Sequence, residues 1–386
     1  MTLKVGQGAG APAFIVMDVI AAANARQATL PPGAAGIIRM EVGQPATGAP
    51  LGAVAAVEAA LRSGHALGYT EAFGRPGLRA RIAAHVRDWY GLDLSPARVA
   101  VTTGASGAFP LAFLAAFDPG DRIALATPFY PPYVNILVAL GLRPVLLPTD
   151  AGTRYQPNVA MLEQLDPPPD GLIVASPSNP AGSMLHADEL AAIARWCDSA
   201  GVRLVSDEIY HGLQYGPPPV TAAAFSDSAI VINSFSKYFS MTGWRIGWMV
   251  LPPDLTRPVE RLAQNLFISA PHISQVAAEA ALDCHAELAA NVARYRRSRA
   301  RLMAALPQAG FAQLGASEGA FYLYADVSGR TTDSRAFCER MLHEAAVAAA
   351  PGVDFDRVRG HRFVRFSYCG SEADMTEAAA RLTAWT

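Results

Sequence analysis

Lysine is scarce in this chain of 386 residues, since Lys4 and Lys237 are the only two among 31 basic residues. The formal net charge is −2, and no stretch of the sequence gathers basic side chains. Nucleic acids and anionic membrane surfaces are bound by clustered positive charge. We therefore expect neither as a partner, and expect small molecules as ligands instead.

Cysteine is also rare, and the four cysteines lie far apart without a CxxC spacing. This argues against a zinc site and fits reduced thiols in the cytoplasm, so we expect no metal and a cytoplasmic location. The apolar run at residues 14–16 faintly resembles a secretory leader. Asp18 interrupts that apolar region, which therefore reads better as an amphipathic helix.

Two long stretches, residues 99–117 and 123–142, contain no charged residue and are long enough to span a bilayer. Glycine and proline interrupt both of them, with Pro110 in the first and Pro128 and Pro131 in the second. Such helix breakers fit a buried soluble core better than a membrane helix. The chain is long enough for two domains that share one large core.

Apolar strands alternate with helices through the middle of the chain, which predicts an α/β fold with a mostly parallel sheet. After residue 303 the rhythm changes to that of a smaller α+β domain. The strands expected are residues 37–42, 99–101, 123–126, 144–147, 172–175, 203–206, 229–232, 246–251, 320–325 and 362–367. The helices expected are residues 14–20, 54–63, 77–90, 104–116, 159–165, 187–200, 255–266, 273–303, 334–345 and 372–384.

Lys237 follows a buried strand and stands among small hydroxyl residues, with Ser234 and Ser236 before it and Arg245 after it. Burial lowers the pKa of a lysine and frees its amine to condense with an aldehyde. Two hydroxyls and a guanidinium can hold a phosphate group. A lysine in an ordinary surface loop would need none of these neighbours, so the segment predicts a phosphate-bearing aldehyde cofactor.

Further polar residues follow other strands of the expected sheet. Ala105 and Ser106 open a helix after a small-residue turn, where free N–H groups favour an anion. Asp207 ends a strand at the edge where open α/β sheets bind ligands, although it could also cap a helix. Asn179 offers an amide from a proline-bounded loop. Arg365 lies within an apolar strand and needs either a salt bridge or a carboxylate ligand.

Taken together in this order, the segments from Gly43 to Arg365 resemble the class I/II aminotransferases, which are fold-type I enzymes that depend on pyridoxal 5'-phosphate (PLP). The resemblance implies a large domain with a mixed, mostly parallel seven-stranded sheet at residues 44–280. It implies a smaller α+β domain at residues 281–386, with which an N-terminal segment, residues 1–43, packs.

The same resemblance implies a role for each candidate residue. Lys237 would carry the cofactor and move a proton, with Asp207 on the pyridine nitrogen and Tyr210 and Asn179 on the phenolic oxygen. Tyr130 would stack on the pyridine ring. The remaining residues would bind the phosphate (Ala105, Ser106, Ser234, Arg245 and Tyr69, the last from a neighbouring subunit of a homodimer) or the substrate (Gly43, Asn179 and Arg365).

The implied reaction moves an α-amino group from an amino acid to a 2-oxo acid by a ping-pong mechanism. A PLP-dependent lyase, for elimination or decarboxylation, shares the same residues. A non-enzymatic PLP-sensing regulator is disfavoured because no DNA-binding segment fits before Gly43. A dehydrogenase is disfavoured because the chain has no dinucleotide fingerprint.

The sequence also bears on the amino donor. Aspartate-selective relatives need a second cation, because a desolvated charge must be paired. Ser106 stands where one such group has lysine, and residues 265–275 offer only His272. We therefore expect neutral, apolar or aromatic donors, unless Arg75 or Arg26 supplies the charge.

Overall fold

A seven-stranded sheet forms the centre of the computed structural model, which describes residues 3–311 and 313–385. The strand order is β2-β8-β7-β6-β5-β3-β4. Strand β8 runs antiparallel to both of its neighbours, and the other pairs are parallel. The predicted α/β class with a mostly parallel sheet is confirmed. The bounds are β2 (Val99–Thr102), β3 (Arg122–Thr127), β4 (Arg143–Pro148), β5 (Gly171–Ala175), β6 (Arg203–Asp207), β7 (Ile230–Ser234) and β8 (Gly247–Val250).

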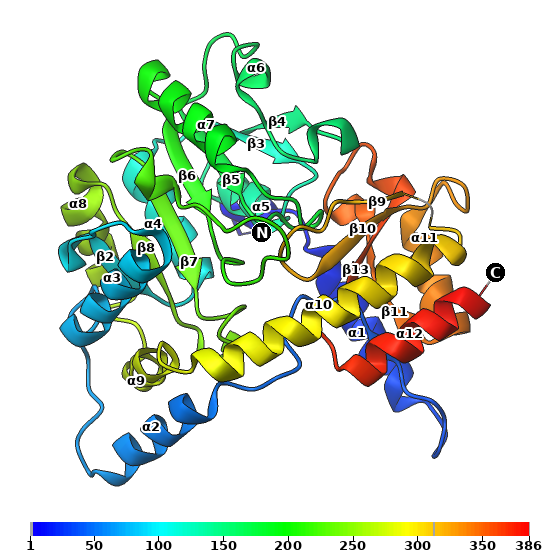
Figure 1. Cartoon of the computed structure of the whole chain (residues 1–386). Helices are drawn as coiled ribbons and strands as arrows, with labels where there is room; N and C mark the ends of the chain where they lie inside the picture. Colours follow the sequence, from blue (N-terminus) through cyan, green and yellow to red (C-terminus); the bar gives the residue numbers. More distant parts are fainter. Residues whose placement is uncertain (1–2, 312, 386) are drawn as a thin grey trace.

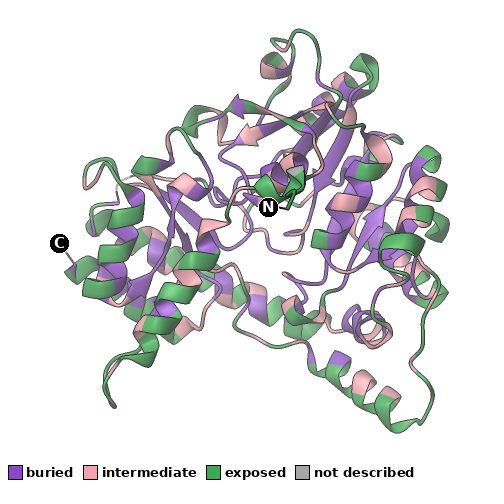
Figure 2. Ribbon diagram, turned by 180° about the vertical axis from the view of Figure 1, so that it is seen from behind, coloured by how far each residue is buried: buried purple, intermediate pink, exposed green. Residues whose placement is uncertain are grey.

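Helices cover both faces of this sheet, which is why its inner strands are apolar on both sides. On β5, Leu172 and Val174 face a core covered by α3 and α7, while Ile173 faces a core covered by α4, α5 and α8. Figure 2 shows the sheet buried and α2 largely exposed on an arm that extends from the body. The helices are α2 (Leu51–Arg62), α3 (Pro76–Tyr90), α4 (Ala105–Ala116), α5 (Pro132–Ala139), α6 (Val159–Leu162), α7 (Ala187–Ala200), α8 (Pro253–Leu266) and α9 (His272–Ala281).

The C-terminal part contains an antiparallel sheet of order β12-β13-β10-β9. The beginning of the chain joins it, since β1 pairs in parallel with β11 and α1 packs beside β11 and β12 (Figure 1). The division at residues 43 and 280 stays a prediction. The elements are α1 (Ile15–Ala28), β1 (Ile38–Arg39), α10 (His285–Gln308), β9 (Gln313–Leu314), β10 (Tyr322–Asp326), α11 (Ser334–Arg340), β11 (Val347–Ala348), β12 (Ala350–Pro351), β13 (Phe363–Ser367) and α12 (Glu372–Ala384).

Three of the expected elements show where the structure departs from the sequence-based expectation. The single helix expected at 273–303 is two helices, because the chain turns at residues 282–284 so that α9 packs on α2 and α10 on α12. No glycine or proline marks this turn. The strand expected at 37–42 pairs only as β1, and its continuation leads into the site described below. The helix expected at 334–345 ends as α11 at Arg340 and continues as a π-helical turn.

Helix α5 was not predicted, because prolines fill the segment before it. Pro132 occupies the first turn of the helix, where its missing N–H costs nothing. The helix thus begins immediately after the aromatic residues that follow β3. Across residues 3–311 and 313–385, no helix has both the length and the apolar character that a bilayer crossing requires.

Candidate active site

A cavity of about 710 Å³ lies beside the carboxyl ends of the large-sheet strands and is bounded opposite by residues of β10, β13 and α1. Its volume suits a cofactor together with a small substrate. Most of the residues singled out from the sequence line it, namely Gly43, Ala105, Ser106, Tyr130, Asn179, Asp207, Tyr210, Lys237, Arg245 and Arg365. These residues are spread over more than 300 positions of the sequence, and the ends of the strands bring them together.

Lys237 projects into this cavity from the loop after β7. Its Nζ donates a hydrogen bond to the backbone oxygen of Gly43 at 2.7 Å. Burial, helped by the nearby guanidinium groups of Arg365 and Arg245, lowers the pKa of this lysine to about 8 against the opposing effects of Cys369 and Asp207. The amine is therefore partly neutral near physiological pH, as a nucleophile and proton carrier must be.

Asp207, the last residue of β6, is a buried carboxylate in the cavity wall. One oxygen accepts a hydrogen bond from the hydroxyl of Tyr133, and the other accepts from the N–H of Ile209 at 3.1 Å. Burial raises the pKa of Asp207 to about 6, against the lowering effect of these hydrogen bonds. In the described ranges of the chain no cation lies within ion-pair distance of Asp207, so the carboxylate suits a cationic group of a ligand.

An anion cradle is formed by the first turn of α4 and Arg245. The N–H groups of Ala105 and Ser106 begin the helix and have no intrahelical partner, so they carry partial positive charge toward the cavity. Arg245 lies beside them, with Nη2 at 3.4 Å from the hydroxyl of Ser106. Gly104 permits this approach, because a Cβ there would lie 2.7 Å from Nη2 of Arg245. The cradle matches the chemistry of a phosphate group.

Two tyrosine hydroxyls meet near Lys237, whose Nζ lies 5.9 Å from the centroid of the Tyr210 ring. The hydroxyl of Tyr210 lies 2.8 Å from that of Tyr322, which belongs to β10. Burial raises the pKa of Tyr210 well above its ordinary value, and Tyr322 adds to this effect. Tyr210 therefore stays protonated and can donate a hydrogen bond to an oxygen of a bound ligand.

Arg365 lies in β13 with 2 % of its surface exposed. Its Nη1 donates to Oδ1 of Asn179 at 2.9 Å, and Nη2 donates to the backbone oxygen of Glu41. Within the part of the chain that the structure describes, its Nε has no partner and no carboxylate pairs with it. The alternative of a structural salt bridge is therefore wrong. A buried guanidinium with unused donors fits a carboxylate ligand.

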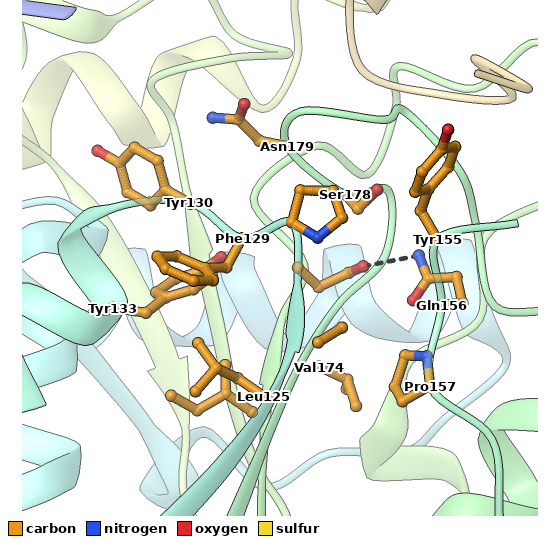
Figure 3. A pocket seen from close by; sticks show the side chains of 14 residues that line it. Leu125, Phe129, Tyr130, Tyr133, Tyr155, Gln156, Pro157, Val174, Ser178 and Asn179 are labelled. Carbon is orange, nitrogen blue, oxygen red and sulfur yellow. Dashed lines mark hydrogen bonds between the residues drawn. The ribbon is translucent and has the colours of Figure 1, made fainter. Parts of the chain in front are cut away.

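The loop that carries Asn179 is held at both ends by Gln156. Its Nε2 donates to the backbone oxygens of Ala175 at 3.1 Å and of Ser183 at 3.0 Å. Figure 3 shows Gln156 across a small pocket from Tyr130 and Tyr133, with its bond to the end of β5 drawn as a dashed line. Since Oδ1 of Asn179 accepts from Arg365, its amide nitrogen is left to donate to a ligand.

Two predicted residues do not line the cavity. The hydroxyl of Ser234 is buried behind it, where it donates to the backbone oxygen of Ile246 at 3.1 Å and lies 2.9 Å from Oγ of Ser236. Ser236 lines the cavity instead. Tyr69 is 84 % exposed in the loop after α2, outside the cavity of its own chain. A role for Tyr69 therefore depends on a second subunit.

Several lining residues were not found from the sequence. Tyr133 belongs to the unpredicted helix α5, while Tyr322 comes from the far sheet and is placed by tertiary packing alone. Phe14, Val16, Met17 and Ile20 of the N-terminal segment also line the cavity. No local pattern separates Tyr322 from Tyr324, which is equally buried in the same strand but does not line the cavity.

The residues present fit PLP. Among the described residues that line the cavity, Lys237, Arg245 and Arg365 are cations and Asp207 is the one carboxylate. The excess of positive charge suits a phosphate and a substrate carboxylate, and Asp207 suits a protonated ring nitrogen. Lys237, whose pKa is lowered by burial, lines the same cavity and supplies an amine for the aldehyde of the cofactor.

Comparison with known proteins supports the same identification. The sequence profile "Aminotransferase class I and II" matches residues 35–382. A valine–pyruvate aminotransferase of Mycobacterium tuberculosis is 48 % identical over 389 aligned residues, covering 100 % of this chain and 99 % of the relative. A crystal structure of an aminotransferase from M. tuberculosis superposes with a TM-score of 0.96 at 48 % identity, covering 100 % of this chain and 99 % of the other. One of a putative aminotransferase from Silicibacter pomeroyi gives 0.92 at 50 % identity, covering 99 % of each.

Proposed function

The chain belongs to the class I and II aminotransferases, and we propose that its amino donors are neutral α-amino acids with apolar side chains. Members of the family depend on PLP and transfer the amino group of an amino acid to a 2-oxo acid. When bound, the cofactor supplies an electron sink for the carbanion at Cα. The name of the valine–pyruvate relative supports valine-like donors and pyruvate as the acceptor.

The geometry supports a role for each residue in this reaction. Arg365 would bind the α-carboxylate, and the neutral amine of Lys237 would take the proton from Cα of the donor onto its Nζ. Asp207 would keep the ring nitrogen of the cofactor protonated, while Tyr210 and Asn179 would donate to its phenolic oxygen. Arg245, Ser106 and the first N–H groups of α4 would hold its phosphate. Because one clamp, Arg365, serves both the amino acid and the oxo acid, the two substrates use the site in turn, as in a ping-pong mechanism.

The proposal about the amino donor rests on the charged side chains that line the cavity. Each of the three lining cations already has a partner in this scheme, which leaves none in the described lining for a distal carboxylate. The two alternative cations lie elsewhere: Arg75 pairs with Glu279 at 2.9 Å, and Arg26 does not line the cavity. An aspartate side chain would therefore be desolvated without a partner.

A donor panel tests this proposal. We expect kcat/KM for valine and phenylalanine to exceed that for aspartate by on the order of 100-fold or more, because an uncompensated buried charge costs about 3–5 kcal/mol. Initial rates with varied valine and pyruvate should give parallel lines in double-reciprocal plots. Converging lines would contradict the ping-pong scheme, and a preference for aspartate would contradict the apolar pocket.

We also propose a homodimer in which Tyr69 reaches the cavity of the partner subunit. Helix α2 has one buried residue, Ala53, and leaves Leu51 and Leu61 exposed. Residues 266–268 are exposed and apolar as well, and Ile268 has φ of +63°, which is unusual for a β-branched residue. Exposed apolar surface of this kind marks an interaction site.

Subunit complementation tests the shared site. Tyr69→Phe and Lys237→Ala chains, each of low activity alone, are mixed, unfolded and refolded together. In a mixed dimer one site receives both an intact Lys237 and an intact Tyr69, so we expect about a quarter of wild-type activity to return, given random pairing. A fully active monomer in sedimentation, or no recovery in mixed dimers, would argue against the shared site.

A further inference from the structure

Helix α1 forms a wall of the cavity that none of the proposed roles uses. Its segment contributes Phe14, Val16, Met17 and Ile20, and all four side chains are apolar. Phe14 meets Tyr130 edge to face, with ring centroids 5.9 Å apart and planes at 86°. An amino acid bound beside Tyr130 would therefore contact hydrocarbon on this side.

The wall lies next to the proposed carboxylate clamp. The guanidinium of Arg365 stacks on the ring of Phe355, 4.7 Å from its centroid. Phe355 in turn belongs to a small apolar cluster with Val16, against which Phe14 and Ile20 pack. A ligand held at Arg365 by its carboxylate thus has its side chain within reach of α1.

The first turn of α1 is held by a residue from the other end of the chain. Phe14, in the N-cap position, offers no side-chain cap. Instead, Oδ1 of Asp354 accepts from the N–H of Ile15 and Oδ2 from the N–H of Val16, both at 3.0 Å. A carboxylate in this position satisfies two free donors and complements the positive end of the helix dipole.

Besides the apolar cluster around Phe355 and the contact of Phe14 with Tyr130, little else fixes this end of the helix. Val16 and Ala23 are the only buried residues recorded within α1. The opposite side of its first turns faces two more cavities, of about 210 and 270 Å³, both lined by Ile15. Sparse packing lowers the cost of local opening, so the two hydrogen bonds to Asp354 carry much of the positional constraint.

We propose that α1 is the wall that selects the side chain of the amino donor, and that Asp354 is the positioning residue that holds this wall against the cavity. The proposal rests on the proposed aminotransferase function and deepens it. The ligand class is an α-amino acid with an apolar side chain larger than a methyl group. Alanine, bound through its carboxylate and amine alone, does not depend on the wall.

The first test is a graded series, Asp354→Asn and Asp354→Ala, compared with Asp333→Asn. Asp333 accepts from the N–H groups of Arg335 and Ala336 and so caps α11 in the same way, without touching α1. Hydrogen–deuterium exchange of the peptide covering α1 should rise by about 2–30-fold in the Asp354 variants, the range expected for a lost helix cap. The Asp333 variant should leave that peptide unchanged.

The second test compares the change in KM with the change in kcat for two amino donors. In Asp354→Asn we expect KM for valine to rise by about fourfold for each methylene that loses its contact, so on the order of tenfold, at nearly constant kcat. KM for alanine should stay within about twofold. An equal rise for alanine and valine, or unchanged exchange in α1, would overturn the proposal.

A gain-of-function variant complements these losses. Met17→Arg places a cation on the wall at a position that is 57 % exposed, where the substitution should not disturb folding. We expect kcat/KM for aspartate relative to valine to rise at least tenfold, and no change in that ratio would count against the wall. If the wild-type protein accepts no amino acid at all, the proposed function is wrong. The hydrogen–deuterium exchange experiment still tests whether Asp354 holds α1, because it needs no turnover, and so the failure of one proposal can be told from the failure of the other.

Discussion

The phenol of Tyr322 occupies the space that a side chain on Gly43 would need. A Cβ built on Gly43 would overlap the hydroxyl of Tyr322 and stand 2.7 Å from its Cζ. The same glycine accepts the hydrogen bond from Lys237, and the same hydroxyl pairs with Tyr210. The absence of a side chain on Gly43 thus allows Tyr322 of β10 to approach the backbone that binds Lys237.

Gly43→Ala should therefore move Tyr322 and Lys237 apart. Overpacking at a buried contact costs about 1–3 kcal/mol of stability. A displacement of about 1 Å in the site can lower kcat/KM by on the order of 100-fold. Urea unfolding and steady-state kinetics measure the two effects. Gly48→Ala is the control, since nothing lies within 4 Å of a Cβ there. If both variants behave like the wild type, the contact does not constrain the site.

Lys237→Ala should abolish amino transfer while the protein still folds. After loading with PLP and reduction with borohydride, the cofactor mass should appear on the peptide that contains Lys237. The chain makes this assignment simple, because Lys4 is the one alternative lysine in the sequence. Recovery of the label on Lys4 would refute the assignment.

The reactivity of Lys237 should follow its lowered pKa. The pKa of Lys237 is about 8. At a pH below this value the amine is mostly protonated and unreactive, and at a pH above it the amine is mostly neutral. Competitive acetylation of the cofactor-free protein should therefore give a rate for Lys237 that rises with pH and levels off above about pH 8–9. An ordinary lysine, with a pKa near 10.5, would still be rising there. A curve that keeps rising to pH 10 would contradict the role of burial.

The sequence identified the site residues that follow strands, and it did so for a physical reason. Lys237 and Asp207 stand just beyond apolar runs, and parallel strands bring such ends to one edge of a sheet. Ser234 is predicted at the phosphate, but Ser236 lines the cavity, because the sequence pattern does not encode which of the two hydroxyls faces it. Tyr322 and Asp354 were missed because their contacts join segments hundreds of residues apart, which no local pattern encodes.

Asp207→Asn should slow removal of the Cα proton far more than it weakens cofactor binding. The substitution keeps the shape but removes the charge that would hold a ring nitrogen protonated. A loss of one preorganised electrostatic contact lowers rates by on the order of 100–1,000-fold. Stopped-flow absorbance and cofactor titration measure the two quantities, and small, equal losses in both would reduce Asp207 to a structural residue.

Glu208→Gln is the matched control for that experiment. Glu208 is the next residue, but it faces away from the cavity and hydrogen-bonds to Ser206, Thr221 and the N–H of Ala222. Burial raises its pKa to about 8, so it is largely protonated at neutral pH and glutamine resembles it. We expect its kcat to stay close to that of the wild type.

Arg365→Ala should weaken amino-acid binding by about ten- to a hundredfold for each charge-assisted hydrogen bond lost, at about 1.5–3 kcal/mol per bond. Amines without a carboxylate should be little affected. Arg362→Ala is the control, because Arg362 lies just before the same strand and pairs with Asp326 at 2.7 Å near the surface. Equal losses for amino acids and simple amines would refute the clamp.

The pairing of Asp354 with the first turn of α1 has a consequence for synthesis. The two partners are separated by 339 and 338 positions. At about 5–20 residues per second, a ribosome makes the helix roughly 17–70 s before the carboxylate that fixes it. The most N-terminal helix is therefore among the last parts of the nascent protein to reach its final place, and the cavity stays open to solvent until translation is nearly complete.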